Sequence, residues 1–229
     1  MNIILFDDPV YRINLLPFTF TRPVACLRTG ILTIAEKWEK YFQARVSFST
    51  TNYLQKKFPL TLSSDNLWIN GAVCPDESLV KRIVQLQTGE GLILENKVIA
   101  LRSPEEELPE VITGKMTAYT SPITVIDQVW KIFQFNGDQI GADLKLITSN
   151  RTSAGIQDPH TKLYSPENIF VEEGVYIRAA VLNAETGPIY LGKNSIVQEG
   201  ALIRGPFSMG EGAHLNMGAK MRGNVSIGP

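Results

Sequence analysis

The chain contains little cysteine and little histidine. Its 229 residues include two cysteines, Cys26 and Cys74, and two histidines, His160 and His214. Two cysteines do not make a disulfide framework, so we expect a protein of the reducing cytoplasm. The two histidines are far apart in the sequence, which argues against a zinc site built from them.

Long apolar runs and a large excess of one charge are also absent. No run of about eighteen apolar residues occurs, so no membrane-spanning helix is predicted. The formal net charge is −1 at pH 7, which gives no general electrostatic attraction to nucleic acid. The first residues, MNIILFDD, lack the basic region and the cleavage site of a signal peptide. We therefore expect a cytoplasmic protein with neither a membrane nor a nucleic acid as partner.

A period of six residues is present near the C-terminus. Aliphatic residues recur at Leu191, Val197, Ile203, Met209, Leu215, Met221 and Ile227. Small residues follow most of them four positions later, at Ser195, Ala201, Ala213, Ala219 and Val225, with Phe207 as the exception. This period fits neither an isolated α-helix nor an ordinary strand, and it is typical of a hexapeptide β-helix. We predict a left-handed parallel β-helix whose interior is filled by the aliphatic residues.

The repeat is less regular upstream. Val171 and Ile177 keep the period, which continues to Asn183 and Ile189, two positions out of step with Leu191. We interpret residues 183–188 as a loop or bulge between two coils. Glycines that recur in phase, and the lack of a hairpin pattern, argue against a β-sandwich. The predicted β-helix covers residues 169–229 and is incomplete, and the polar residues 151–168 form a connector before it.

Residues 1–150 alternate between strand and helix patterns. A buried strand is expected over 2–6, followed by a loop, with further strands over 45–49 and 66–70. Helices are expected over 30–43, after the N-cap Asp76, and along a stripe that runs from Val125 to Phe133. A hairpin is expected around 95–97. This alternation predicts an α/β domain with a mostly parallel sheet.

The loop after the first strand is the place to look for a ligand, because ligands bind beyond the carboxyl ends of parallel strands. It contains the acidic pair Asp7 and Asp8 and the arginines Arg12 and Arg22. The arginines could bind phosphate oxygens, and the carboxylates could hold a divalent cation or a sugar hydroxyl. The alternative is two surface arginines and an acidic pair that ends a strand. The local sequence leaves both open.

Three long strings carry a family resemblance: FDDPVYRINLLPFTFTRPVACLRTGILTIAEKW, NAETGPIYLGKNSIVQEGALIRGP and MGAKMRGNVSIGP. They resemble a Bacteroidetes-type group of sugar-1-phosphate nucleotidyltransferases, whose Rossmann-like α/β domain precedes a hexapeptide β-helix. The resemblance covers essentially the whole chain. It implies a nucleoside triphosphate and a sugar 1-phosphate as substrates, magnesium as cofactor, and a homo-oligomer, trimer or dimer.

The resemblance also suggests roles for particular residues. Arg12 stands near the arginine of the family's glycine-rich loop, and the stretch 16–19 resembles the L-x-P-L-T that follows it; Arg22 lies near a family lysine. By this comparison Arg12 and Arg22 stabilise phosphate charge, Asn70 and Gly71 line the sugar or base pocket, and Asp7 or Asp8 helps to hold magnesium.

Several departures from the family pattern favour a second hypothesis. No glycine lies between Met1 and Arg28, and Ala72 stands where a metal-binding aspartate is expected. The chain also stops within a hexad, where members of the group continue, and His214 is expected to point into solvent rather than to act as a base. The alternative function is therefore a catalytically degenerate domain, which serves as a ligand-binding or scaffold module for an acyltransferase-like β-helix.

Overall fold

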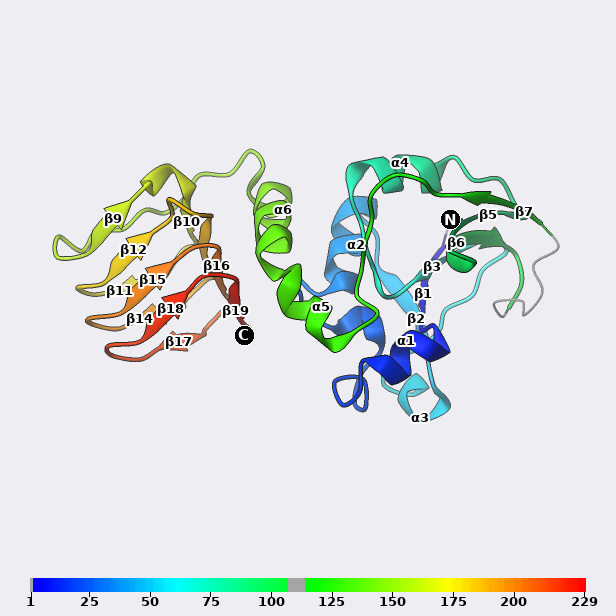
Figure 1. Cartoon of the computed structure of the whole chain (residues 1–229), viewed down its shortest axis with the longest axis horizontal. Helices are drawn as coiled ribbons and strands as arrows, with labels where there is room; N and C mark the ends of the chain where they lie inside the picture. The colour runs from blue at the N-terminus through cyan, green and yellow to red at the C-terminus, as the bar shows by residue number, and fades with distance from the viewer. Residues whose placement is uncertain (1, 107–113) are drawn as a thin grey trace. The chain divides into compact units, whose positions relative to one another are not determined.

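A computed structural model describes residues 2–106 and 114–229 and divides the chain into two compact units. The first unit contains the N-terminal segment up to Leu27 and residues 33–129. The second unit contains Arg28–Leu32 and Trp130–Pro229. Figure 1 shows the first unit as a sheet with helices and the second as stacked short strands beside a helix.

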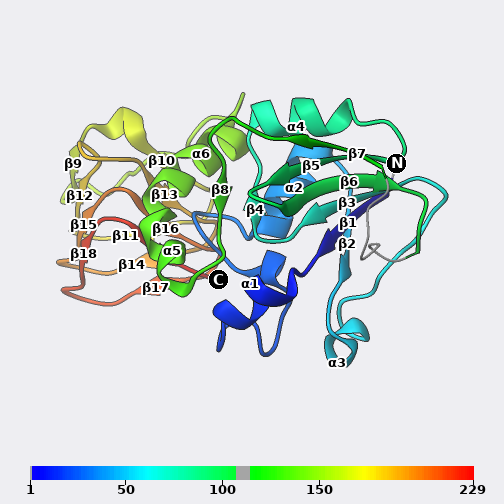
Figure 2. The same cartoon turned by 45° about the vertical axis from the view of Figure 1, so that its right-hand side comes forward.

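The first unit is built on a six-stranded mixed sheet in the order β2-β1-β3-β6-β5-β7. Strand β1 pairs in parallel with β2 and β3, and β5 pairs in parallel with β7, whereas β6 is antiparallel to β3 and β5 (Figure 2). The strands are β1 Asn2–Phe6, β2 Val46–Ser49, β3 Asn66–Asn70, β5 Glu90–Leu94, β6 Lys97–Ser103 and β7 Lys115–Ala118. The predicted α/β class is confirmed.

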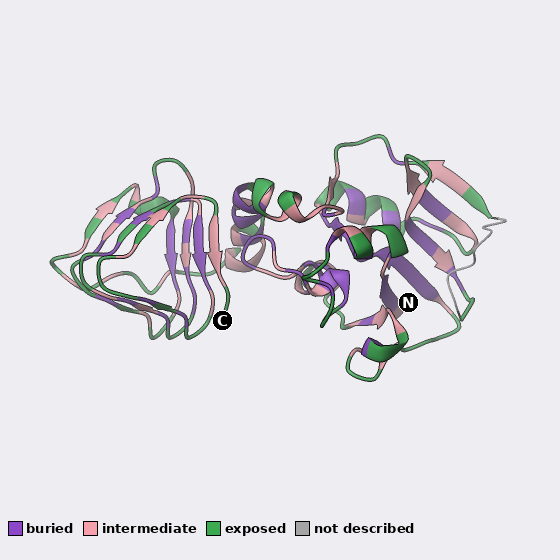
Figure 3. Cartoon of the chain, turned by 60° about the horizontal axis from the view of Figure 1, so that its bottom comes forward, coloured by how far each residue is buried: buried purple, intermediate pink, exposed green. Residues whose placement is uncertain are grey.

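The central strands are buried on both faces. Ile3, Ile4 and Leu5 of β1 are at most 2% exposed, and every residue of β3 is buried (Figure 3). Continuous apolar runs of this kind are typical of strands that are covered on both sides. The strands expected over 2–6 and 66–70 are found with these bounds, and β5 and β6 form the hairpin expected around 95–97.

The longer helices of the first unit begin at side-chain caps. Thr33 and Glu36 make a capping box at the start of α2, and Asp76 accepts a hydrogen bond from the Leu79 N–H at the start of α4. The bounds are α1 Pro9–Asn14, η1 Val24–Cys26, α2 Ile34–Phe42, α3 Asn52–Gln55 and α4 Glu77–Val84. The helix expected over 30–43 therefore begins only after its capping residue.

Two expectations for this unit need correction. The segment after β1 was expected to be a loop, but it contains α1, because Asp8 caps the helix and Pro9 suits its first turn. Val125 was expected on a helical stripe, but it lies in β8 (Thr124–Val125), which pairs with β4 (Val73–Cys74).

Besides Arg28–Leu32, the second unit consists of α5 (Val129–Gln134, whose first residue is assigned to the first unit), α6 (Asn136–Thr148) and a β-helix. The coils supply β9 Lys162–Tyr164, η2 Pro166–Asn168, β10 Ile169–Val171, β11 Tyr176–Ile177, β12 Val181–Asn183, β13 Ile189–Leu191, β14 Ile196–Val197, β15 Leu202–Arg204, β16 Phe207–Met209, β17 His214–Leu215, β18 Lys220–Arg222 and β19 Val225–Ile227. They form three parallel sheets, β10-β13-β16-β19, β11-β14-β17 and β18-β15-β12-β9.

Successive coils differ in length at the place where an insertion was expected. Ile169 pairs with Ile189, a spacing of 20 residues, whereas Ile189 pairs with Phe207, a spacing of 18. The extra length lies in the turn after β12, where the loop over 183–188 was predicted. Strand β9 pairs with β12 and lies inside the segment expected to be a connector, so the coils begin before residue 169.

The interior of the β-helix follows the period of six. Leu191, Val197, Ile203, Met209 and Leu215 are at most 3% exposed, and Met221 and Ile227 pack against the same cluster. One position differs from the expectation: Leu182, not Asn183, points inward, because Leu182 is the residue that pairs with Ile203. His214 is exposed, as expected.

Segment Arg28–Leu32 is bound to α6 and to β19 of the β-helix. The Gly30 N–H donates to Asn136 Oδ1 at 2.7 Å, and the N–H groups of Ile31 and Leu32 donate to Asp143 Oδ2 at 2.8 and 3.0 Å. The Ser226 hydroxyl donates to the Gly30 carbonyl at 2.7 Å. These bonds tie an early stretch of the sequence into the second unit. Within residues 2–106 and 114–229, no helix is long and apolar enough to cross a membrane.

Candidate functional site

The carboxyl ends of β1 and β3 meet at one edge of the sheet. Phe6 at the end of β1 is the register partner of Asn70 at the end of β3, and the Gly71 N–H donates to the Phe6 carbonyl at 2.8 Å. The residues that follow, Asp7 and Asp8 on one side and Gly71 on the other, therefore lie at the same edge. This is the edge at which ligands bind in open parallel sheets.

The Asp7 side chain is buried, and its carboxylate accepts three hydrogen bonds. Its Oδ1 accepts from the Val24 N–H at 2.8 Å, and its Oδ2 accepts from the Thr50 hydroxyl at 2.6 Å and from Arg12 at 2.8 Å. Burial raises the pKa of the Asp7 carboxyl, and these hydrogen bonds oppose the rise. Asp7 thus joins the end of β1 to the first residue of η1 and to Thr50, which follows β2.

Arg12 lies on α1 and is also buried. Its guanidinium donates to Asp7, to the backbone carbonyls of Thr19 and Arg22, and to the Tyr53 hydroxyl at 2.9 Å. The side chain of Arg12 is 9% exposed and that of Asp7 is 6% exposed. The predicted pair of Asp7 and Arg12 is therefore brought together, but as a buried ion pair, and the same guanidinium also holds the backbone carbonyls of Thr19 and Arg22.

Asp8 caps α1 and pairs with a lysine that sequence reasoning missed. Its Oδ1 accepts from the Val10 and Tyr11 N–H groups at 2.9 and 3.1 Å, and its Oδ2 lies 3.1 Å from Lys97 Nζ. Lys97 Nζ also lies 5.4 Å from the centre of the Tyr11 ring. The Lys97 side chain is 40% exposed, so its charge remains accessible from solvent.

A pocket of about 480 Å³ lies beside these residues, between α1, the end of β2 and α3. Its wall is largely apolar, with Pro9, Ile13, Leu16 and Phe20 on one side. Asp7, Arg12, Ser49, Thr50, Thr51 and Tyr53 supply the polar groups. The buried Thr51 hydroxyl has no hydrogen-bond partner among the described residues.

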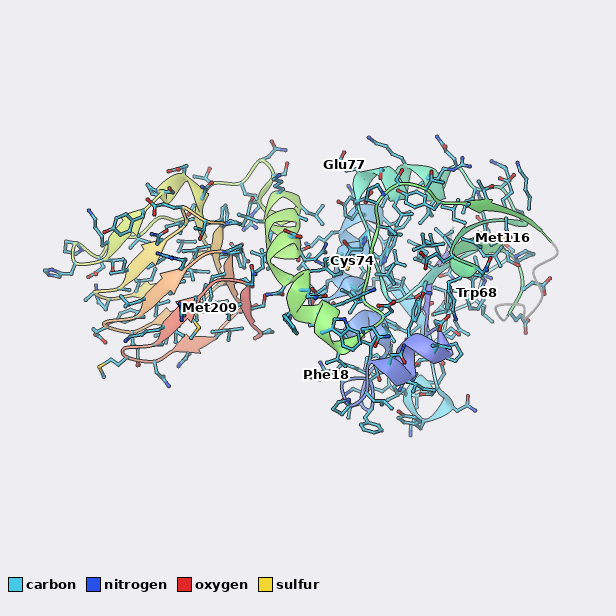
Figure 4. All side chains as sticks on the ribbon, in the orientation of Figure 1. Phe18, Trp68, Cys74, Glu77, Met116 and Met209 are labelled. Carbon is cyan, nitrogen blue, oxygen red and sulfur yellow. The ribbon has the colours of Figure 1, made fainter. Side chains whose placement is uncertain are left out.

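The rim of the pocket exposes large apolar side chains. Ile13, Phe20 and Tyr53 are each more than half exposed, and Phe18, labelled in Figure 4, is 48% exposed in the segment after α1. Large apolar side chains in solvent beside a pocket are typical of a ligand-binding site.

Asn70 and Gly71 are held in place by the backbone around them. Asn70 Nδ2 donates to the Val98 carbonyl at 3.2 Å, and its Oδ1 accepts from the Ala72 N–H at 3.0 Å. A Cβ atom on Gly71 would lie 3.1 Å from the Phe6 carbonyl oxygen, so a side chain there would be tightly packed. Ala72 is 1% exposed and offers no ligand atom.

Comparison with known proteins gives a family. The sequence profile described as sugar nucleotidyl transferase matches residues 3–152, which include the pocket and all the candidate residues above. The chain belongs to the sugar nucleotidyl transferase family. A search of curated proteins found no match.

The two candidate arginines of the nucleotidyl transferase domain differ in exposure, because Arg12 is buried and Arg22 is not. Arg22 is exposed, and its side chain forms no hydrogen bond or ion pair within the described part of the chain. Cys26, four positions along the chain, is half-buried, and burial together with the charge of Asp7 raises the pKa of its thiol to about 12. Arg22 is therefore the candidate arginine with a free guanidinium.

The transferase domain does not present an open metal site in its described residues. No group of three or more His, Cys, Asp or Glu side chains among residues 2–106 and 114–229 could hold a metal ion. Asp7 and Asp8 each accept three hydrogen bonds already. These two carboxylates do not fit a magnesium site held by the protein alone.

Proposed function

We propose that this domain transfers a nucleotidyl group from a nucleoside triphosphate to a sugar 1-phosphate. The observation that carries the proposal is the pocket at the carboxyl ends of β1 and β2, inside the region that matches the family. A phosphate oxygen of the sugar 1-phosphate attacks the α-phosphorus. The bond from that phosphorus to the bridging oxygen breaks, and pyrophosphate leaves.

The accessible cations are proposed to stabilise phosphate charge in this reaction. Among residues 2–106 and 114–229, the Arg22 guanidinium has no hydrogen-bond or ion-pair partner, and the ammonium of Lys97 contacts Asp8 and the Tyr11 ring. Both lie on segments that border the edge formed by Asp7 and Asn70. Fixed cations near developing phosphate charge lower the barrier of phosphoryl transfer. Asn70 and Gly71 are not in the wall of the 480 Å³ pocket, but they lie at the same edge of the sheet and are proposed to contact the sugar or base there.

Arg12 is proposed to act by positioning. Its guanidinium is neutralised by Asp7 and holds the Thr19 and Arg22 carbonyls, so it fixes the segment that carries Arg22. The magnesium ion implied by the family resemblance stays a prediction, and no step of the reaction is assigned to it.

A second candidate function rests on the same geometry. The buried pairing of Arg12 with Asp7, and the alanine at position 72, leave the edge with fewer free charges than a nucleotidyl transferase is expected to need. In this case the domain binds a nucleotide or sugar phosphate without turnover and serves as a sensor or scaffold for the β-helix.

One experiment separates the two candidates. Pyrophosphate release is measured with a panel of nucleoside triphosphates and sugar 1-phosphates in the presence of magnesium, and binding of the same compounds is measured by calorimetry. Release that falls at least tenfold in Arg22→Ala and Lys97→Met, but not in the control Lys115→Met, supports transfer. Lys115 is a suitable control because its side chain is 77% exposed and pairs with Glu90. Binding without release supports the second candidate.

A further inference from the structure

One face of the β-helix carries four cations and no carboxylate. In the sheet β18-β15-β12-β9, the middle residue of each strand packs inward and the two flanking residues point outward. The strands of this sheet lie one above another in Figure 1. The outward residues are Lys162, Tyr164, Val181, Asn183, Leu202, Arg204, Lys220 and Arg222. We call this surface the basic face.

No carboxylate among the described residues forms an ion pair with a cation of the basic face. Arg204 and Arg222 are direct register partners on neighbouring strands, which lie about 4.8 Å apart in a sheet. Like charges directly opposite each other destabilise a sheet. Neither arginine, nor Lys220, has an ion-pair partner within the described residues. The nearby carboxylate of Glu185 accepts a hydrogen bond from Asn183 Nδ2 at 2.9 Å.

Apolar side chains lie between the cations. Across the sheet, one outward row runs Lys162, Val181, Leu202 and Lys220, so two aliphatic residues separate two lysines. Leu202 is 43% exposed and Tyr164 is 41% exposed. An apolar centre with a charged rim, rich in arginine and tyrosine, is the usual composition of a protein–protein interface.

We propose that the basic face binds a short acidic segment of a partner protein, with a carboxylate that bridges Arg204 and Arg222 and an apolar side chain that packs on Leu202. Four strands span about 14 Å, which is too small for an interface between globular domains. Four cations are also fewer than the six to ten phosphate contacts that a nucleic-acid-binding protein commonly makes. A carboxylate bound between Arg204 and Arg222 would reduce the electrostatic repulsion between these two side chains.

Fluorescence anisotropy tests the proposal on the full chain. The probe is a fluorescein-labelled peptide in which glutamates flank a leucine and a tyrosine, and the control peptide carries glutamine in place of glutamate. We expect Arg204→Gln with Arg222→Gln to weaken binding at least tenfold, Leu202→Ser to weaken it severalfold, and added salt to weaken it further. The matched control is Lys145→Gln with Lys193→Gln, which removes the same charge from exposed positions of this unit and leaves binding unchanged.

The melting temperature checks that lost binding is not lost folding. Removal of the repulsion between the two arginines is expected to leave the melting temperature equal or higher. If the melting temperature of the double arginine variant falls, peptide binding is compared instead between the unchanged protein and Lys220→Gln, which removes a single charge of the basic face. The proposal is overturned if the acidic peptide does not bind, if it binds all variants equally, or if only a single-stranded oligonucleotide or an anionic lipid vesicle binds this face.

Discussion

At the scale of single residues, the ion pair of Asp7 and Arg12 determines the shape of the pocket edge. Asp7→Ala leaves the Arg12 guanidinium buried without its counter-charge. Removal of one partner of a buried pair costs about 3–5 kcal/mol, so we expect the free energy of unfolding to fall by about that amount. Urea unfolding measures the change, followed by the fluorescence of Trp38 and Trp68, which are both fully buried in the first compact unit.

The double variant Asp7→Ala with Arg12→Met is the control for this prediction. It removes both charges, so it should be more stable than Asp7→Ala alone. A loss below about 1 kcal/mol in the single variant would show that Arg12 reaches water or another acceptor when Asp7 is absent.

A second prediction at this scale concerns the two thiols. The pKa of Cys26 is raised to about 12, so at pH 8 its thiolate is on the order of a thousandfold scarcer than that of an ordinary cysteine. Cys74 is buried. We expect slow labelling of the folded protein by a disulfide reagent and rapid labelling of two thiols in denaturant. Cys74→Ser isolates Cys26, and rapid labelling of that folded variant would contradict the prediction.

The sequence predicted which candidate residues share one edge of the sheet, but it did not predict the contacts that they make there. The rule that ligands bind beyond parallel strands brings Asp7, Asp8, Asn70 and Gly71 to one edge, as the structure shows. It does not reveal that Arg12 turns inward, because its acceptors include backbone carbonyls whose positions depend on the folded segment. Lys97 was missed because its approach to Asp8 depends on sheet order, 89 positions away in sequence.

At the scale of elements, the segment Arg28–Leu32 depends on Gly30. Gly30 has φ of +89°, and a Cβ atom there would lie 2.5 Å from Asp143 Oδ2 and 2.8 Å from the Gln139 backbone. Gly30→Ala is therefore expected to lower the stability of the second unit by more than the roughly 1–2 kcal/mol of a left-handed alanine. Thermal unfolding by circular dichroism measures it.

Gly218→Ala is the matched control for Gly30→Ala. Gly218 has φ of +68° with no atom within 4 Å of an added Cβ, so only the backbone cost applies. Equal losses in the two variants would show that the contacts with α6 adjust to the added methyl group.

The coils provide a second prediction for elements. Ile203 is 2% exposed inside the β-helix, and its neighbour Leu202 is 43% exposed outside it. Ile203→Ala is expected to cost about 2–5 kcal/mol, while Leu202→Ala costs under about 1 kcal/mol. Urea unfolding of the two variants makes the comparison, and a similar cost for both would argue against the inward register.

The regular period of six residues made the inward positions of the β-helix predictable, whereas its irregular turns did not follow that period. The period of six identified the inward residues from Leu191 onward. It failed at Asn183 because only five positions separate Ile177 from the next inward residue, Leu182, so the period shifts by one there. It also gave no sign of β9, whose three residues are too short to show any repeat.

At the scale of the whole molecule, the sequence indicated an α/β domain followed by a β-helix, and the fold class is confirmed. One feature of the whole molecule could not be predicted from the order of elements along the chain. Arg28–Leu32 belongs to the second compact unit although it lies between parts of the first. Periodicity describes neighbours in sequence, and this segment is defined by bonds to Asn136 and Asp143, more than a hundred positions away.

Self-association is the last prediction, and it concerns the third side of the β-helix. In the sheet β11-β14-β17, the outward row is Tyr176, Ile196 and His214, which carries little charge. Tyr176 is 46% exposed, and flat sheet faces of this kind favour symmetric packing between copies of a chain. We expect light scattering after size exclusion to give a multiple of 25.4 kDa, as a trimer or a dimer.

Ile196→Glu should shift the protein towards the monomer, because the new charge would be buried between copies. Val84→Glu, which places the same charge on the exposed face of α4, should leave the assembly unchanged. A mass of 25.4 kDa across the micromolar range would refute self-association. An oligomer that survives Ile196→Glu would move the contact to another face.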